Sequence, residues 1–220
     1  IGPEHSLLEI GCGWGGFAEH AAREIGCPVT AITISPAQHE FAAKRIHEAG
    51  LADKVDVRLQ DYRDVAESFD RIASIEMFEA VGEKYWPIYF HTVRERLKPG
   101  GRAALQIITI ADHLFGSYRK GTDFVQKYIF PGGMLPSPTE LRSHCARAGL
   151  EMAGSLDFGE SYSRTLREWR GVFNSRWQEI SELGFDGRFW RMWNFYLSTC
   201  AACFAAGSTS VCQMTLRRGG

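Results

Sequence analysis

The sequence has no unbroken apolar run of the roughly 20 residues that a helix needs to cross a bilayer, because the longest uncharged stretch, 192–216, is interrupted by asparagine, glutamine, serines and threonines. A secretory signal is missing too, because the first residues, Ile1 to His5, lead straight into a candidate strand. These absences predict a cytoplasmic protein. Since residue 1 is not methionine, we also expect a fragment whose upstream part is missing.

An excess of charge of either sign is also missing. The 25 lysines and arginines nearly balance the 26 aspartates and glutamates, and the net charge of -1 argues against a nucleic-acid partner. Basic residues do gather on two late candidate helices: Arg164, Arg167, Arg170, Arg176, Arg188 and Arg191. These arginines form either a solvated face or a contact for lipid phosphates.

Cysteine occurs without the spacing of a disulfide framework or a zinc site. Six cysteines are scattered over candidate helices, strands and one turn: Cys12, Cys27, Cys145, Cys200, Cys203 and Cys212. Cys200 and Cys203 form a C-x-x-C pair, but no second pair and no nearby histidine completes a zinc site. We therefore expect reduced thiols and no bound metal.

The first half of the chain alternates candidate strands and helices. Apolar runs predict strands at 6–10, 29–34, 55–59, 69–75 and 102–110. Helices are expected up to Gly26, from the Ser35 cap to Gly50, and from Pro87 to a turn at 98–101. Strands separated by helices predict an α/β fold with a doubly wound, mostly parallel sheet.

The alternation breaks after Ile110. Residues 111–138 are rich in glycine, proline and aromatics without a clear period, which is typical of a functional loop. The elements expected after it are a helix at 138–149, a strand at 150–158, helices at about 163–183 and 186–206, and a strand at 209–216. We predict one domain, 1–220, with a seven-stranded sheet and an inserted aromatic, largely helical cap formed by 111–138 and 159–206.

A glycine-rich segment, Glu9 to Gly16, joins the first strand to the first helix. Glycines there let the backbone turn sharply and approach a ligand closely. The spacing also satisfies the G-x-G-x-x-G pattern of dinucleotide sites, but that site needs an acid at the end of the second strand. The sequence has Ile32-Thr33-Ile34-Ser35 there instead, and Trp14 would crowd a pyrophosphate.

The same segment resembles the first motif of class I methyltransferases, in which an acid before the glycines faces the bound methionine. Glu9 is that acid here, Gln60-Asp61-Tyr62 follows the third strand, and a Pro-Gly-Gly turn precedes the fifth. The resemblance implies a Rossmann-like fold and S-adenosylmethionine as cofactor. The residues expected to bind it are Glu9, Gly11, Gly13, Trp14, Gly15, Thr33, Gln38, Asp61 and Tyr62.

A narrower resemblance covers almost the whole chain. Segments similar to the cyclopropane-fatty-acyl-phospholipid synthase family lie at 11–16, 33–38, 60–64, 77–82, 127–137 and 195–200. The family acts on the double bonds of phospholipid acyl chains, which implies a peripheral position at the membrane surface and leaves a homodimer open. The missing upstream part would be the family's N-terminal helical segment.

The resemblance also implies catalytic and substrate-binding residues. Glu79 and Tyr162 match positions that hold a bicarbonate ion, and Cys200 matches a cysteine discussed as an active-site residue. Aromatic faces would stabilise the carbocation left by methyl transfer, and a base would then remove a proton. The acyl-binding candidates are Phe78, Phe130, Trp193 and Tyr196.

Simpler interpretations remain open for several of these residues. Glu79 could be an ordinary helix-start carboxylate, Cys200 could only pack, and the late aromatic stripe could be core. Ala80 and Gln106 depart from histidines common in the family, so loss of a different proton, giving a methylene or methyl branch in place of a ring, stays an alternative. A silent lipid- or cofactor-binding module and a methyltransferase for small molecules are further alternatives.

Overall fold

The computed structural model describes all 220 residues, and the chain divides into two compact units. Unit 1 contains residues 1–107, 140–155 and 213–220, and unit 2 contains 108–139 and 156–212. The two segments expected to form a cap, 111–138 and 159–206, both fall within unit 2. A single catalytic domain over 1–220 stays a prediction.

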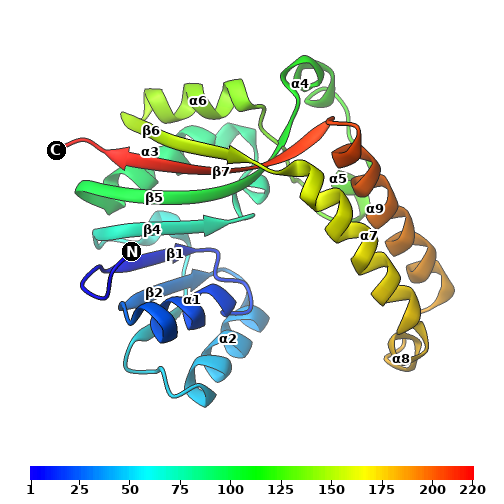
Figure 1. Cartoon of the computed structure of the whole chain (residues 1–220), viewed down its shortest axis with the longest axis horizontal. Coiled ribbons are helices and arrows are strands. Elements are labelled where there is room, and N and C mark those ends of the chain that lie inside the picture. The colour runs from blue at the N-terminus through cyan, green and yellow to red at the C-terminus, as the bar shows by residue number, and fades with distance from the viewer. The chain divides into compact units, whose positions relative to one another are not determined.

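A seven-stranded sheet, most of whose residues belong to unit 1, has the strand order β3-β2-β1-β4-β5-β7-β6 (Figure 1). The strands are β1 Leu7–Ile10, β2 Val29–Thr33, β3 Val55–Leu59, β4 Phe69–Ile75, β5 Leu97–Ile110, β6 Leu150–Asp157 and β7 Thr209–Arg218. Strands β1 to β5 pair in parallel, with Glu9 opposite Ala31 on β2 and opposite Ala73 on β4. The predicted doubly wound, mostly parallel sheet of seven strands is confirmed.

Small residues let the first helices lie close to the sheet. Helix α1 (Gly16–His20) continues into a π-helical turn, Ala21–Ile25, so the single helix expected up to Gly26 is two elements. Ala18, Ala21 and Ala22 are fully buried against β1 and β2. Because alanine side chains are short, the glycine turn before α1 is held tightly against the strand ends.

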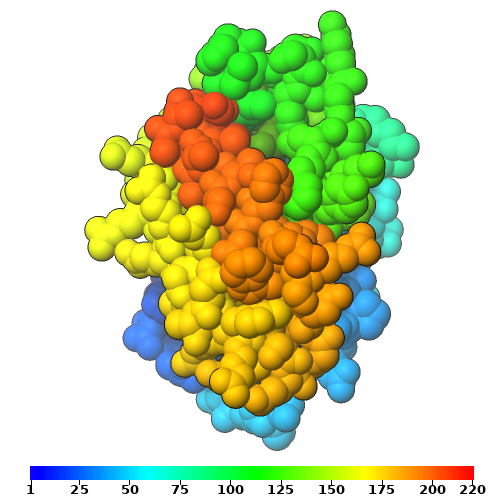
Figure 2. All heavy atoms as spheres, turned by 90° about the vertical axis from the view of Figure 1, so that its right-hand side faces the viewer, coloured from blue at the N-terminus to red at the C-terminus, as the bar shows by residue number.

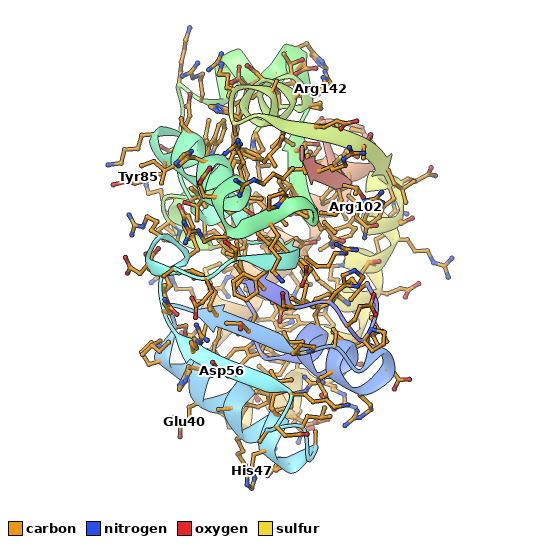
Figure 3. The ribbon with its side chains drawn as sticks, turned by 90° about the vertical axis from the view of Figure 1, so that its left-hand side faces the viewer. Glu40, His47, Asp56, Tyr85, Arg102 and Arg142 are labelled. Carbon is orange, nitrogen blue, oxygen red and sulfur yellow. The ribbon has the colours of Figure 1, made fainter.

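Helix α2 (Pro36–Glu48) begins as the sequence predicts. The backbone N–H of Gln38 donates to the Ser35 hydroxyl, and Pro36 occupies the first turn. Figure 3 shows Glu40 and His47 on the outer side of this helix, while Ala42 and Ile46 on the opposite side are buried. The helix therefore packs its apolar face against the sheet.

An aromatic cluster joins α3 (Trp86–Arg96) to α6 (Pro138–Arg147). Phe78, Trp86 and Phe90 are almost completely buried, and the Phe90 ring stacks on His144 of α6 at 6.1 Å. β5 begins at Leu97, five residues before the predicted start, because the expected turn at 98–101 is accommodated as an irregularity in its pairing with β4.

Unit 2 is built from helices that carry most of the late aromatic residues. They are α4 Asp112–Tyr118, α5 Phe124–Tyr128, α7 Gly159–Ser175, α8 Trp177–Glu182 and α9 Gly187–Ala205. Figures 1 and 2 show α7 and α9 side by side, and Leu166, Leu197 and Phe204 are buried between them. The Ser163 hydroxyl donates to the carbonyl of Ala201 at 2.9 Å, which ties the two helices together.

Two sequence-based boundaries in unit 2 are wrong. The helix expected at 163–183 begins at Gly159 and breaks at Arg176, where φ is -103°. Residues 111–138 are more regular than expected, because α5 begins with a reciprocal capping box between Asp123 and Gln126. No helix of the structure combines the length and apolar content needed to cross a membrane.

Candidate cofactor and catalytic site

The glycine turn between β1 and α1 depends on three left-handed glycines. Gly11, Gly13 and Gly15 have φ values of 82°, 52° and 80°. The N–H groups of Gly11 and Cys12 both donate to the carbonyl of Ile32 on β2, at 3.0 and 2.9 Å. The turn is therefore anchored to the carboxyl end of the neighbouring strand.

Each of these glycines meets a different environment. A Cβ at Gly11 would lie 2.5 Å from Cγ of Met77, which is a clash, and one at Gly15 would lie 3.1 Å from Cβ of Ala42, which is a tight contact. A Cβ at Gly13 would meet nothing within 4 Å. Trp14, which is 54% exposed, packs edge-to-face on Phe41. Open space therefore surrounds the middle of the turn, where a ligand would approach the backbone.

Glu9 lies directly before this turn, in β1. It is only 3% exposed, and its Oε2 atom is buried without a hydrogen-bond partner. Burial raises the pKa of the Glu9 carboxyl to about 8, and a backbone hydrogen bond from Ala18 offsets only part of that effect. An unsatisfied buried carboxyl is a costly feature that a cationic ligand would satisfy.

Thr33 and Gln38 come together at the end of β2. The Thr33 hydroxyl donates to the Gln38 side-chain carbonyl at 2.8 Å and accepts from the backbone N–H of Ser35 at 3.1 Å. Gln38 therefore uses its carbonyl oxygen within the protein. Its amide N–H groups remain available to hydrogen-bond acceptors on a ligand.

Asp61 and Tyr62 follow β3, where the resemblance expects adenine to bind. The Asp61 carboxylate accepts from Nε and Nη2 of Arg63 at 2.9 and 2.6 Å, and the guanidinium holds the pKa of Asp61 below its usual range. Tyr62 is half-buried and packs edge-to-face on Tyr89 at 5.5 Å. Sequence reasoning missed Arg63, although a basic residue two positions after an aspartate is a recognisable signal for such a pair.

The segment after β4 carries the first catalytic candidate. Glu79 is half-buried in a short 3-10 turn, Phe78–Ala80. The neighbouring ring of Phe78 is 1% exposed and packs against Trp86, Tyr89 and Phe90. This position gives Phe78 a packing role in the core of unit 1, and acyl binding by this residue stays a prediction.

Sequence reasoning also missed Glu76, which precedes that turn. Glu76 is the one non-glycine residue of the chain with positive φ, at 51°. Gln106 donates from Nε2 to Oε1 of Glu76 at 2.8 Å. The backbone conformation of a glutamate has no signal in the sequence, so only the structure could reveal it.

Tyr162 and Cys200 belong to unit 2. The Tyr162 ring contacts Phe158 and Phe204, at centroid distances of 5.7 and 5.4 Å. Cys200 is half-buried beside the cluster of Leu166, Leu197 and Phe204, and burial raises the pKa of its thiol to about 12. Because the thiolate is the reactive form, this pKa argues against a nucleophilic role and favours packing. All six cysteines are free thiols.

The remaining acyl-binding candidates form one aromatic row in unit 2. Trp193 packs on Tyr196 at 5.1 Å between ring centroids, and Tyr196 meets Phe130 edge-to-face at 6.2 Å. Phe189 extends the row by stacking on Trp193 at 5.6 Å. The structure therefore brings Phe130, Trp193 and Tyr196 into one row, and their role in acyl binding stays a prediction.

A separate hollow in unit 2, of about 770 Å³, lies near the start of α7. It is lined by Gly159, Glu160, Ser161, Ser163, Arg164, Arg167, Phe204, Ala205, Gly207, Thr209 and Ser210. None of the candidate site residues is among them. No group of three or more histidine, cysteine or carboxylate side chains is arranged to hold a metal ion.

Solved structures of other proteins have the same fold as this chain. The cyclopropane synthase MmaA2 from Mycobacterium tuberculosis superposes with a TM-score of 0.91 and 26% identity, covering 99% of this chain and 79% of its own. The match extends over nearly the whole chain. It includes both the sheet of unit 1 and the helices of unit 2.

Sequence comparison gives closer matches. Tuberculostearic acid methyltransferase UfaA1 from Mycobacterium tuberculosis is 40% identical over 97% of this chain, and the Escherichia coli cyclopropane-fatty-acyl-phospholipid synthase is 38% identical over 99% of it. The chain spans only 50% and 54% of the lengths of these two relatives. Residues 1–214 match the family model of mycolic acid cyclopropane synthetases, and the chain belongs to that family.

Proposed function

We propose that this chain is the catalytic part of an S-adenosylmethionine-dependent methyltransferase that alkylates the double bond of an unsaturated phospholipid acyl chain. The observation that carries the proposal is the buried carboxyl of Glu9, with its unsatisfied Oε2, directly before an open glycine turn. Family membership supports the same conclusion, because relatives in the family are named for methyl transfer to fatty acids and for cyclopropane formation.

The residues of unit 1 fit the cofactor. Glu9 would meet its positively charged methionine part, the backbone at Gly13 would lie against it, and Asp61 and Tyr62 would meet the adenine. Gln38 would donate its free amide N–H groups to the ribose hydroxyls or the carboxylate. When bound, the cofactor supplies a methyl group on a sulfonium, which a weak nucleophile such as an alkene can attack.

The aromatic row of unit 2 suits an acyl chain. An isolated alkene has no polar group to hold, so apolar walls must position it and exclude water. The faces of Trp193, Tyr196 and Phe130 would also stabilise positive charge on the chain without forming a bond to it. Bicarbonate is a candidate ligand of Glu79 and of Tyr162, because the resemblance matches each of them to a position that holds this ion.

Cyclopropane formation is the leading product, and a methyl or methylene branch is the second candidate. The second is favoured by one specific feature: Gln106 occupies a position where the family's ring-forming members often have histidine. The similarity to a tuberculostearic acid methyltransferase at 40% identity points the same way. Loss of a proton from the new methyl closes a ring, whereas loss from a neighbouring chain carbon leaves a branch.

A membrane surface is the proposed location of this chemistry. Three large apolar side chains are exposed here: Leu183 and Phe185 in the turn between α8 and α9, and Trp190 near the start of α9, with exposed fractions of 78%, 44% and 38%. Arg188 and Arg191 flank them on α9 without a carboxylate partner. Apolar side chains beside unpaired arginines are typical of surfaces that enter the headgroup region of a bilayer.

Mass analysis of lipid products tests the proposal. Purified protein of full natural length, incubated with S-adenosylmethionine and unsaturated phospholipid vesicles, should add about 14 mass units per methylated acyl chain. Fragmentation of the product then distinguishes ring from branch. Cofactor binding by calorimetry with unchanged lipid would instead indicate the silent binding module, and absence of cofactor binding would overturn the proposal.

A further inference from the structure

Glu76 holds a backbone conformation that side chains other than glycine rarely adopt. Its φ of 51° is the only positive value at a non-glycine residue in the chain. An L residue pays a steric cost there, and such residues persist where the surrounding structure holds them and function uses them. Glycine would fit this position without that cost, so the side chain of Glu76 needs an explanation.

A row of two amides holds the Glu76 side chain. Gln213 donates from Nε2 to Oε1 of Gln106 at 2.8 Å, and Gln106 donates from Nε2 to Oε1 of Glu76 at 2.8 Å. The backbone N–H of Glu76 in turn donates to the carbonyl of Gln106 at 2.8 Å. Both side-chain hydrogen bonds run in the same direction, from Gln213 to Gln106 to Glu76. Each bond therefore polarises the next and strengthens the final hydrogen bond to the carboxylate.

Glu76 also lies beside the glycine turn. It directly follows β4, which pairs with β1 in parallel, Ala73 opposite Glu9. The next residue, Met77, is the one that a Cβ at Gly11 would strike. The carboxylate is therefore displayed at the carboxyl edge of the sheet, where ligands of open α/β sheets bind.

We propose that Glu76 is a second catalytic carboxylate, which accepts the proton that leaves the methylated acyl chain. This inference rests on the function proposed above. The two π electrons of the alkene would form the new carbon–carbon bond to the methyl group of S-adenosylmethionine, while the bond from that methyl to sulfur breaks and S-adenosylhomocysteine leaves with the electron pair. The neighbouring alkene carbon is then left electron-deficient. The electron pair of a C–H bond fills that carbon, the proton passes to a carboxylate oxygen of Glu76, and water later removes it.

The amides that hold Glu76 suit this role. An imidazolium in the place of Gln106 would put positive charge near the carbocation that methyl transfer produces, whereas a glutamine donates a hydrogen bond and carries no charge. The Gln106 amide therefore orients the Glu76 carboxylate without adding a positive charge beside the developing cation. In this account Gln106 and Gln213 are positioning residues.

Two substitutions separate a proton acceptor from a structural role. Glu76→Gln keeps the shape and removes the charge, and Glu76→Gly removes the side chain while fitting the backbone. We expect turnover on unsaturated phospholipid vesicles to fall about tenfold or more in both, with cofactor affinity by calorimetry changed less than about threefold. Excess formate should restore activity about fivefold or more in Glu76→Gly alone, because only that variant leaves room for a small carboxylate.

The control is Glu40→Gln, on the outer side of α2. Its turnover should equal that of the wild type and should not change when formate is added. The melting temperature without cofactor checks folding, and Glu76→Gly should match or exceed wild type because its backbone cost is relieved. Two outcomes would overturn the inference and leave the proposed function intact. One is wild-type turnover in either Glu76 variant, and the other is a Glu76→Gly variant whose activity formate does not restore. Absence of lipid methylation by the wild type would overturn the proposed function as well.

Discussion

The Glu9 carboxyl lies beneath an open turn at 3% exposure, and its pKa is raised from 4.5 to about 8 by burial. A folded-state pKa above the unfolded value means that the folded protein keeps a proton that the unfolded chain loses. The stability contributed by this group is therefore full below about pH 4.5 and is lost as pH rises through about 8. A bound cofactor would give the Glu9 carboxylate a cationic partner, and the folded protein would then favour the ionised form of Glu9 over the protonated form.

Glu9→Gln should flatten this dependence, because an amide of the same shape does not titrate. Without cofactor, the melting temperature of wild type should fall relative to the variant between about pH 5 and pH 8, leaving the variant about 3 °C or more higher at pH 8. Its affinity for S-adenosylmethionine should be weaker. Thermal scans across this pH range measure the first effect, with Glu40→Gln as control; parallel pH curves for wild type and Glu9→Gln would contradict the prediction.

Single residues were predicted unevenly from the sequence. The glycine turn was predicted from its place between the first strand and the first helix, and Thr33, Gln38 and Asp61 were named from the resemblance; their role in cofactor binding stays a prediction. The pairing of Asp61 with Arg63, the buried state of Glu9 and the strained backbone of Glu76 depend on three-dimensional surroundings. No periodicity or motif encodes an exposed fraction or a positive φ.

At the scale of elements, the turn between β1 and α1 is the one most sensitive to substitution. Gly11→Ala should lower the free energy of unfolding by about 2 kcal/mol or more, because it combines a positive φ with a Cβ 2.5 Å from Met77. Gly13→Ala is the matched comparison: it shares the positive φ but has open space, and should cost about 1 kcal/mol. Urea unfolding midpoints measure both, and equal losses would show that the Met77 contact is unimportant.

Elements with strong local signals were predicted closely. Helix α2 begins at the expected Ser35 cap, and the sheet has the expected seven strands. The errors fall where local signals conflict with tertiary context. Pro99 and two glycines indicated a turn that the structure absorbs into β5, and the aromatic pattern through Arg176 hid the break between α7 and α8. The capping box at Asp123 was present in the sequence and was overlooked.

For the whole molecule, the exposed turn between α8 and α9 predicts a salt-dependent interaction with anionic membranes. Replacing both Arg188 and Arg191 by glutamine should weaken binding to anionic vesicles about tenfold or more, since each arginine contributes about 1 kcal/mol near such a surface. Arg164→Gln is the control, because Arg164 already pairs with Glu168 at 2.9 Å. Vesicle sedimentation at low and high salt measures the effect, and undiminished sedimentation of the double variant would contradict it.

The path of the chain through the two units limits how the protein can be dissected. The polypeptide passes from one unit to the other after residues 107, 139, 155 and 212. No single cut can therefore release either unit as one continuous piece. A chimera designed to exchange unit 2 between relatives must therefore replace 108–139 and 156–212 together. Replacing only one of these segments would disrupt the side-chain contacts that it makes with the other.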